Sequence, residues 1–223
     1  MINGQSAGKD FAYLLGTYFG DASVVKRTEN CYTFSIEAID HDFLERVSRE
    51  LKSFTGKQVN IFERNRITGK GNVIYGLTCS KKRLFEQFIL DTGNKKFVPD
   101  YVFSWSIENK VAFIEGVMDS DGWISARKNP AGITQFQMGY GTSFSWTYDI
   151  KRIMESIGMS CSKTREYKLK SGKTMLTFTI GTKSFVTSLV SFTSQRKQSR
   201  VEEYEKLKMQ NKPQRLYAVT EKV

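Results

Sequence analysis

Hydrophobic positions along this chain repeat one order of spacings twice. In the N-terminal part, helix-spaced apolar residues predict helices that include 14–19, 43–54 and 84–89. Segments rich in Val, Ile, Tyr, Phe and Thr predict strands, and these are 23–30, 31–39, 58–66 and 72–80. Gly56 ends the second helix, and the Gly-rich turn 68–71 joins the last two strands. The order is helix, two strands, helix, two strands, helix.

The C-terminal part has the same order of elements. Helices are expected to include 114–120, 150–157 and 185–189, and strands are expected at 123–127, 133–141, 160–168 and 174–180. We therefore predict an α+β fold of two αββαββα halves with pseudo-two-fold symmetry. The halves would be 1–92 and 107–192, with a linker at 93–106 and a charged helix and tail at 193–223.

Each half opens with a near-copy of one short pattern. The first reads LLGTYFGDA at 14–22, and the second reads IEGVMDSDG at 114–122. Small residues four positions apart share one face of a helix. The small residues are Gly16 and Gly20 in the first copy and Gly116 and Ser120 in the second. This spacing predicts that the two helices pack closely on each other through these residues.

That packing would bring two aspartates together. Asp21 and Asp121 would emerge side by side at the C-terminal ends of the two helices. The negative end of a helix dipole disfavours a carboxylate, and two carboxylates also repel each other. The pair would therefore require a cation between its members, which predicts a metal site.

Charge gives the class of partner. The 223 residues include 34 Lys and Arg against 23 Asp and Glu, a net charge of +11. Such an excess favours a polyanion, most often nucleic acid and sometimes an anionic membrane surface. Basic residues concentrate in the hairpins expected at 57–83 and 160–183. Alternation would place many of them on one sheet face, and a β-ribbon of this kind fits the major groove of DNA.

Other residue types exclude several classes of protein. Cys31, Cys79 and Cys161 are odd in number and widely separated, which favours a reducing compartment over a disulfide framework or a zinc site. His41 is the only histidine, so mechanisms that need two histidines are excluded. No segment has the length and apolarity of a membrane span or a signal segment. We therefore expect an intracellular protein, in a bacterial or phage-host cytoplasm or an organelle matrix.

The two motifs, their spacing and the repeated element order together resemble one known family. Over roughly 9–192, the chain is similar to the LAGLIDADG homing endonucleases in their monomeric, two-motif form. The second motif is the closer match, with Gly116, Asp119, Asp121 and Gly122 where the family has Gly, Asp, Asp and Gly. The first motif departs from the pattern, with Phe19 at the first Asp position and Ala22 at the final Gly.

The resemblance implies a site-specific double-strand DNA endonuclease. Such an enzyme recognises a long asymmetric target on a saddle of two curved antiparallel sheets around a central two-helix interface. It cuts one phosphodiester per strand across the minor groove and leaves short 3′ overhangs. By the same resemblance, Asp21 and Asp121 bind divalent metal, with the carbonyls of Gly20 and Ser120 as further ligands. Oxygen ligands suit Mg²⁺, and two or three ions would be shared between the aspartates.

The resemblance also implies further site residues. The family places a lysine after the fourth strand of each half, which here gives Lys82 and Lys183, with Lys81 as the alternative to Lys82. Gln137 is expected to hydrogen-bond metal-bound water, and its counterpart in the first half would be Ser35. The residues expected to contact DNA are basic, and they are Lys26, Arg27, Arg64, Arg66, Lys70, Arg127, Lys128, Arg165, Lys168, Lys170 and Lys173.

Three alternatives stay open at this point. One is a maturase that binds intron RNA on the same fold, although retention of Asp21 and Asp121 favours cleavage. Another is a DNA-binding regulator that does not cut, which would gain nothing from two acids beside a polyanion. The third is a nuclease with an acid-x-Lys pair at 50–52, but that segment reads as the solvated face of an amphipathic helix.

Overall fold

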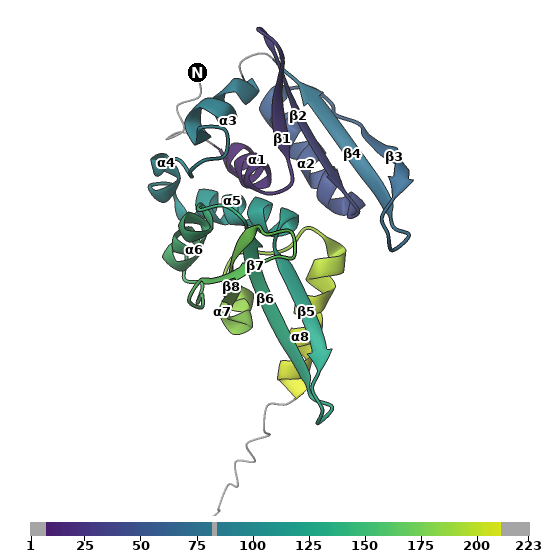
Figure 1. The fold of residues 1–223 in the computed structure, drawn as a ribbon, viewed down its shortest axis with the longest axis vertical. Helices are drawn as coiled ribbons and strands as arrows, with labels where there is room; N and C mark the ends of the chain where they lie inside the picture. The colour runs from purple at the N-terminus through teal and green to yellow at the C-terminus, as the bar shows by residue number, and fades with distance from the viewer. Residues whose placement is uncertain (1–7, 82–83, 211–223) are drawn as a thin grey trace, which may run out of the picture.

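The computed structural model of the chain describes residues 8–81 and 84–210 (Figure 1). The N-terminal half contains α1 (Lys9–Phe19), β1 (Ser23–Thr28), β2 (Cys31–Ala38), α2 (His41–Thr55), β3 (Ile61–Ile67), β4 (Val73–Ser80) and α3 (Leu84–Thr92). A short helix, α4 (Asp100–Phe103), lies between the halves. The C-terminal half contains α5 (Ile107–Ser120), β5 (Trp123–Lys128), β6 (Thr134–Thr142), α6 (Thr147–Ser156), β7 (Arg165–Lys168), β8 (Thr174–Ile180) and α7 (Thr182–Thr187). The chain continues into α8 (Gln195–Gln210).

Each half contains one four-stranded antiparallel sheet, and the α+β fold predicted from the sequence is confirmed. The strand orders are β1-β2-β4-β3 and β5-β6-β8-β7, so the two sheets have equivalent topologies. In the first sheet, the buried pair Phe34 and Cys79 lies on the face that α2 and α3 cover. In the second sheet, the buried pair Tyr140 and Phe178 lies on the face that α6 and α7 cover. Because side chains alternate along a strand, every second residue lies on the opposite side, which we call the open face.

The two halves meet along α1 and α5, which lie against each other in the middle of the molecule (Figure 1). A Cβ atom added to Gly16 would lie 2.0 Å from the carbonyl oxygen of Phe113. A Cβ atom added to Gly116 would lie 2.2 Å from the carbonyl oxygen of Tyr13. The helix backbones are thus in direct contact, and the close packing that the two motifs predict is present.

Three local features differ from the sequence-based prediction. The strand expected at 160–168 is regular only from Arg165, because Cys161 forms an isolated bridge with Ile180 and a one-residue shift in register separates this bridge from the pair Arg165 and Thr177. The last helix of the second half ends before Leu189, which is exposed. Helix α4 was not predicted, since four residues are too few to show a helical period. Within the described residues, no helix has both the length and the apolarity that crossing a membrane requires.

Candidate active site

Asp21 and Asp121 lie where the C-terminal ends of α1 and α5 meet. Asp21 follows Gly20, the C-cap of α1, and Asp121 is itself the C-cap of α5. A Cβ atom added to Gly20 would lie 2.2 Å from the Cβ of Ser120, so the two chain segments that carry the aspartates touch. The structure therefore brings together the two acidic residues that the motifs singled out.

Both carboxyl groups hold protons more tightly than a free aspartate does. The pKa of Asp121 is raised to about 6, first because burial removes water from the carboxylate and second because Asp21 carries a like charge. The pKa of Asp21 is also raised by loss of water, although its side chain keeps an exposed surface. The positive charges of Lys95 and Lys197 lower both pKa values, but they do not cancel the rise. A divalent cation would relieve the repulsion that remains.

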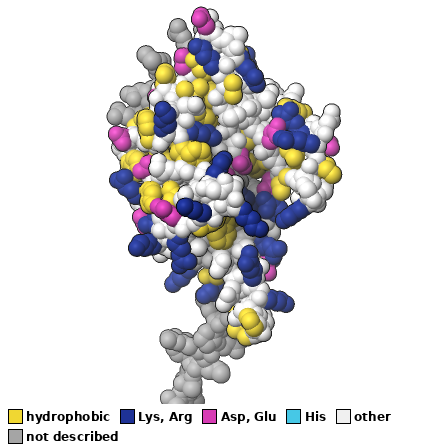
Figure 2. Space-filling model, viewed as in Figure 1, with side chains coloured by type: hydrophobic (Ala, Val, Ile, Leu, Met, Phe, Trp, Pro, Cys, Tyr) yellow, Lys and Arg dark blue, Asp and Glu magenta, His cyan; other side chains and the backbone are white. Residues whose placement is uncertain are grey.

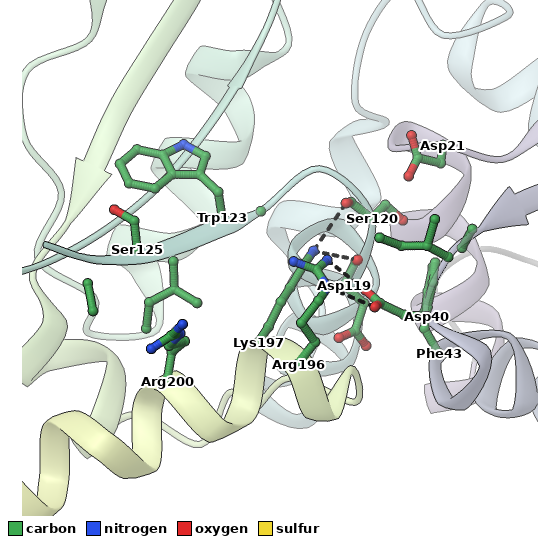
Figure 3. Close-up of a pocket in the computed structure, with 15 residues that line it drawn as sticks. Asp21, Asp40, Phe43, Asp119, Ser120, Trp123, Ser125, Arg196, Lys197 and Arg200 are labelled. Atoms are coloured by element: carbon green, nitrogen blue, oxygen red, sulfur yellow. Dashed lines mark hydrogen bonds and ion pairs between the residues drawn. The ribbon is translucent and has the colours of Figure 1, made fainter. Parts of the chain in front are cut away.

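Lys197, in the first turn of α8, is a buried cation at the end of α5. Its side chain points at the helix end in Figure 3, and the residue is 6% exposed. The ammonium nitrogen Nζ donates to the carbonyl oxygens of Met118 at 2.8 Å, Asp119 at 2.6 Å and Ser120 at 3.2 Å. Burial lowers the pKa of Lys197 to about 8. This positive charge compensates the negative end of the α5 dipole, where Asp121 lies.

Lys95 is placed at the end of α1 in the same way. Its Nζ donates to the carbonyl oxygens of Gly20 at 3.0 Å and Ala22 at 2.6 Å, and burial lowers its pKa to about 8. Its backbone belongs to a run of three left-handed residues, with φ of 56° at Gly93, 58° at Asn94 and 61° at Lys95. A non-glycine residue in this conformation costs about 1–3 kcal/mol. The strained turn is what directs Lys95 to the helix end.

Asp119 holds the segment that carries Lys197. Its Oδ1 accepts hydrogen bonds from the backbone amides of Thr193 at 2.7 Å and Ser194 at 3.4 Å. Its Oδ2 accepts a 2.8 Å hydrogen bond from the hydroxyl of Tyr13 on α1. The carboxylate is buried, and burial raises its pKa while these hydrogen bonds lower it. Asp119 therefore binds distant parts of the chain instead of capping its own helix.

Further polar contacts tie the same segment to both halves. Glu115 on α5 accepts from the amide of Ser191 at 3.1 Å and pairs with Arg46 of α2 at 2.6 Å. Arg196 donates two hydrogen bonds, of 2.8 and 2.9 Å, to Asp40 at the start of α2. We call residues 191–197 the C-terminal strap, since they contact α5 in one half and α2 in the other. A cavity of about 560 Å³ opens beside it, with Asp21, Trp123 and Arg200 among its lining residues (Figure 3).

The chain is similar in sequence to one curated endonuclease. No protein-family model matches the chain. The chain is 26% identical over 199 residues to the homothallic switching endonuclease of Saccharomyces cerevisiae, and the match covers 78% of this chain and 32% of that protein. The chain thus spans about a third of the length of this curated relative.

Two solved structures resemble the whole molecule. The meganuclease I-SmaMI bound to uncleaveable DNA superposes with a TM-score of 0.54 at 12% identity, over 92% of this chain and 90% of that chain. The I-LtrWI LAGLIDADG homing endonuclease bound to target DNA superposes with a TM-score of 0.50 at 13% identity, over 90% of this chain and 89% of that chain. The chain has the LAGLIDADG homing endonuclease fold. Its two motif helices are α1 and α5, as the sequence resemblance implied.

Among the described residues, the lysines beside the aspartates are Lys95 and Lys197, neither of which was singled out from the sequence. Lys82 lies outside the described residues. Lys183, in the first turn of α7, is exposed and lines a separate cavity with Tyr204 of α8. Lys81, the alternative, donates to the backbone carbonyl of Thr55. The lysines that the structure does place there are the two described above, one in the linker and one in the strap.

Gln137 lies on the open face of the second sheet, where it is exposed and pairs with Ser125 of β5. The equivalent residue of β1, Val25, pairs with Thr33 and not with Ser35. Thr33 is therefore the counterpart of Gln137, because the β5–β6 hairpin is longer than the β1–β2 hairpin. The predicted equivalence with Ser35 was wrong.

The residues predicted to contact DNA fall into three groups. On the open faces lie Arg64, Arg66, Arg127 and Arg165, while Arg27 sits in a β-bulge of β1. At strand positions that share the helix-covered faces lie Lys26, Lys128 and Lys168, which pair with Tyr32, Thr134 and Thr174. In turns between strands lie Lys70, Lys170 and Lys173. Alternation therefore places the three lysines of the second group on the opposite side of each sheet from the open-face arginines.

Proposed function

We propose that this chain is a monomeric, divalent-metal-dependent DNA endonuclease of the homing type. It would recognise a long asymmetric duplex and hydrolyse one phosphodiester in each strand across the minor groove, leaving short 3′ overhangs. The observation that carries the proposal is the pairing of Asp21 and Asp121 at the point where α1 and α5 meet. One carboxylate comes from each half, as expected for an enzyme that cuts two strands.

Charge and the relatives support duplex DNA as the substrate. The net charge of +11 and the arginines on both open faces suit a polyanion. The open faces are antiparallel β-ribbons, which can enter a major groove. Solved structures with the same fold hold DNA, as reported above. We assign the open-face arginines and the turn lysines Lys70, Lys170 and Lys173 to DNA contact.

The donor atoms at the aspartate pair fit a hard divalent cation. Within the described residues, no group of three His, Cys, Asp or Glu side chains could hold a metal, so the proposed site rests on two carboxylates. The carbonyl oxygens of Gly20 and Ser120 each accept a lysine ammonium on one lone pair, which leaves the other for the proposed metal. Oxygen donors of this kind suit Mg²⁺, which would supply an activated water and a stabilised leaving oxygen when bound.

We propose two cleavage centres, the first at Asp21 and the second at Asp121. We assign Lys95 to the first and Lys197 to the second, in place of Lys82 and Lys183. Both act electrostatically on the aspartates, and both have a pKa of about 8, so they are mostly charged at neutral pH. An ammonium fixed at this point can orient water and stabilise negative charge that develops on phosphate oxygens. Gln137 faces the same side of its sheet as the arginines and can hydrogen-bond either water or a base edge.

Cleavage of a randomised duplex library in Mg²⁺ tests the proposal. The wild-type chain would be compared with Asp21→Asn and Asp121→Asn, which keep the shape of the site and remove one charge each. We expect enrichment of one long site, cut on both strands with 3′ overhangs, and loss of cutting in both variants. Absence of cleavage together with tight, Mg²⁺-independent binding to a structured RNA would instead identify a maturase.

A further inference from the structure

Arg64 on β3 is held in one position by three neighbours on the open face of the first sheet. Its Nη2 lies 2.7 Å from Oε1 of Glu37 on β2. Its guanidinium carbon lies 4.7 Å from the centroid of the Phe62 ring. Beneath both lies Gly76 of β4, where an added Cβ would be 3.0 Å from Arg64 Nε and 3.3 Å from the Phe62 ring. A carboxylate, an aromatic ring and a glycine thus form a seat for this side chain.

The seat orders a side chain that is still accessible. Arg64 keeps 36% of its side-chain surface exposed, while its Nε is buried and has no hydrogen-bond partner in the described part of the chain. An exposed arginine normally loses about 2 kcal/mol of rotamer entropy when a ligand fixes it, and a side chain already fixed avoids much of that cost. Glu37 engages one of the five N–H donors of the guanidinium, so others remain for a ligand.

Arg66, two residues along the same strand, provides a contrast. It binds the other carboxylate oxygen of Glu37, but 64% of its side chain is exposed, and no ring contact of Arg66 is present in the described structure. The two arginines together carry more positive charge than Glu37 carries negative charge. The cluster therefore remains net positive towards a polyanion. Figure 2 shows basic, acidic and apolar side chains gathered at this β3–β4 end of the molecule.

We propose that Arg64 is a specificity-determining residue that reads one guanine in the major groove, and that Glu37, Phe62 and Gly76 are its positioning residues. The inference rests on the proposed DNA-binding function. A guanidinium that donates to O6 and N7 of guanine is the commonest specific contact to a base, and it requires a fixed plane. A phosphate contact makes no such demand, because it carries no sequence information. Glu37, Phe62 and Gly76 together fix the plane of the Arg64 guanidinium, whereas Arg66 is held by Glu37 without such a ring contact in the described structure.

The test measures binding to the selected target duplex and to every single-base variant of it, in a chelator so that no strand is cut. We expect wild type to prefer guanine at one position by roughly 5- to 150-fold. Arg64→Lys keeps the charge and loses the planar fork that two coplanar bonds to O6 and N7 require, so the guanine preference should fall at that one position while other positions keep theirs. Arg66→Lys is the matched control: it weakens binding to all sequences alike if Arg66 contacts phosphate, and it should leave the guanine preference at that position intact. Weakening of all sequences alike by Arg64→Lys would show a phosphate contact and overturn the inference.

A second pair of variants tests the seat without touching Arg64. Gly76→Ala places a methyl group against the guanidinium and the ring, and Glu37→Gln removes the charge that holds Nη2. Each should reduce the same guanine preference in a chain whose thermal unfolding shows it to be folded. A folded Gly76→Ala chain with full preference would overturn the positioning role. If wild type binds no duplex sequence selectively, the proposed function fails, which is a distinct result.

Discussion

The hydroxyl of Tyr13 donates a 2.8 Å hydrogen bond to the carboxylate of Asp119, a residue 106 positions away on the other motif helix. The second oxygen of that carboxylate binds the C-terminal strap. One buried side chain therefore connects α1, α5 and the segment that brings Lys197 to the aspartate pair. In the first motif, the matching position is Phe19, whose ring packs against Phe113 and Trp146.

We expect Asp119→Asn to lower both stability and cleavage. An amide can keep the bond from Tyr13 only by giving up acceptors for the strap, so the free energy of unfolding should fall by about 2–3 kcal/mol. The displaced strap would move Lys197 and slow cutting. Tyr13→Phe is the control, since it removes one hydrogen bond to the buried carboxylate, costs about 1.5–3 kcal/mol and leaves the strap in place. Urea unfolding and cleavage rates measure both effects, and equal cleavage by the two variants would contradict the role given to Asp119.

Gly16→Ala should disrupt the interface between the halves. The new methyl group would lie 2.0 Å from the Phe113 carbonyl, and neither helix backbone can yield cheaply. We expect a loss of about 3 kcal/mol or more in the free energy of unfolding, or failure to fold. Gly69→Ala is the matched control, because nothing lies within 4 Å of its Cβ position. A Gly16→Ala chain as stable as the Gly69→Ala chain would mean that the helices do not pack as described.

Asp121→Asn should stabilise the metal-free protein at neutral pH. The pKa of Asp121 in the folded chain is about 6 against an ordinary value of 3.8, so the folded chain binds the proton more tightly. Stability from this group therefore falls as pH rises from about 4 to about 6, by about 1–3 kcal/mol in all. In thermal unfolding without metal, the melting temperature of the variant should be higher than that of wild type at about pH 7.5 and equal to it below about pH 4. Mg²⁺ should raise the melting temperature of wild type more than that of the variant, and the opposite order would refute the metal site.

Removing either central lysine should slow cleavage without abolishing DNA binding. Lys95→Met and Lys197→Met each delete an ammonium beside the aspartates, and loss of one such group costs about 100- to 1,000-fold in rate. Both lysines have a pKa of about 8, so cutting by wild type should decline as pH rises past that value and the ammonium groups lose their protons. Lys183→Met is the control and should cut normally under single-turnover conditions. A large loss in that control alone would restore the sequence-based assignment.

The two strands should be cut at unequal rates. The second centre receives its lysine from the strap that Asp119 holds, whereas the first receives Lys95 from a strained turn next to an apolar Phe19. Lys95→Met and Lys197→Met should consequently change the rates of different strands. A supercoiled target would report this as a nicked intermediate that accumulates before linear product. Equal nicking rates for the two strands in wild type would rule out the asymmetry.

The fold and the acidic pair could be predicted because they depend on local patterns. Gly16 and Gly116 recur at helix spacing, and Asp21 and Asp121 follow them at fixed distances. The basic partners could not be found in this way. Lys95 reaches the site through a left-handed turn that Gly93 and Asn94 allow, but nothing in a chain with many lysines distinguishes this one.

Lys197 presented a different difficulty. It lies in a charged helix beyond both repeats, and tertiary contacts of the strap alone bring it back to α5. Alternation along strands gave the correct principle for the basic residues, but the register of each hairpin decided their faces. Lys26, Lys128 and Lys168 consequently share the helix-covered sides of the sheets, a distinction that their charge alone does not make.

The position of the strap also sets an order of events during synthesis. Both aspartates and Lys95 precede it in the chain, so Lys197 and the residues that bind Asp40 and Asp119 leave the ribosome after them. A growing chain can thus pack its two motif helices before the ammonium group of Lys197 reaches the end of α5. Completion of the site waits for synthesis of the strap, so a product terminated before residue 191 would hold both aspartates without the ammonium group of Lys197.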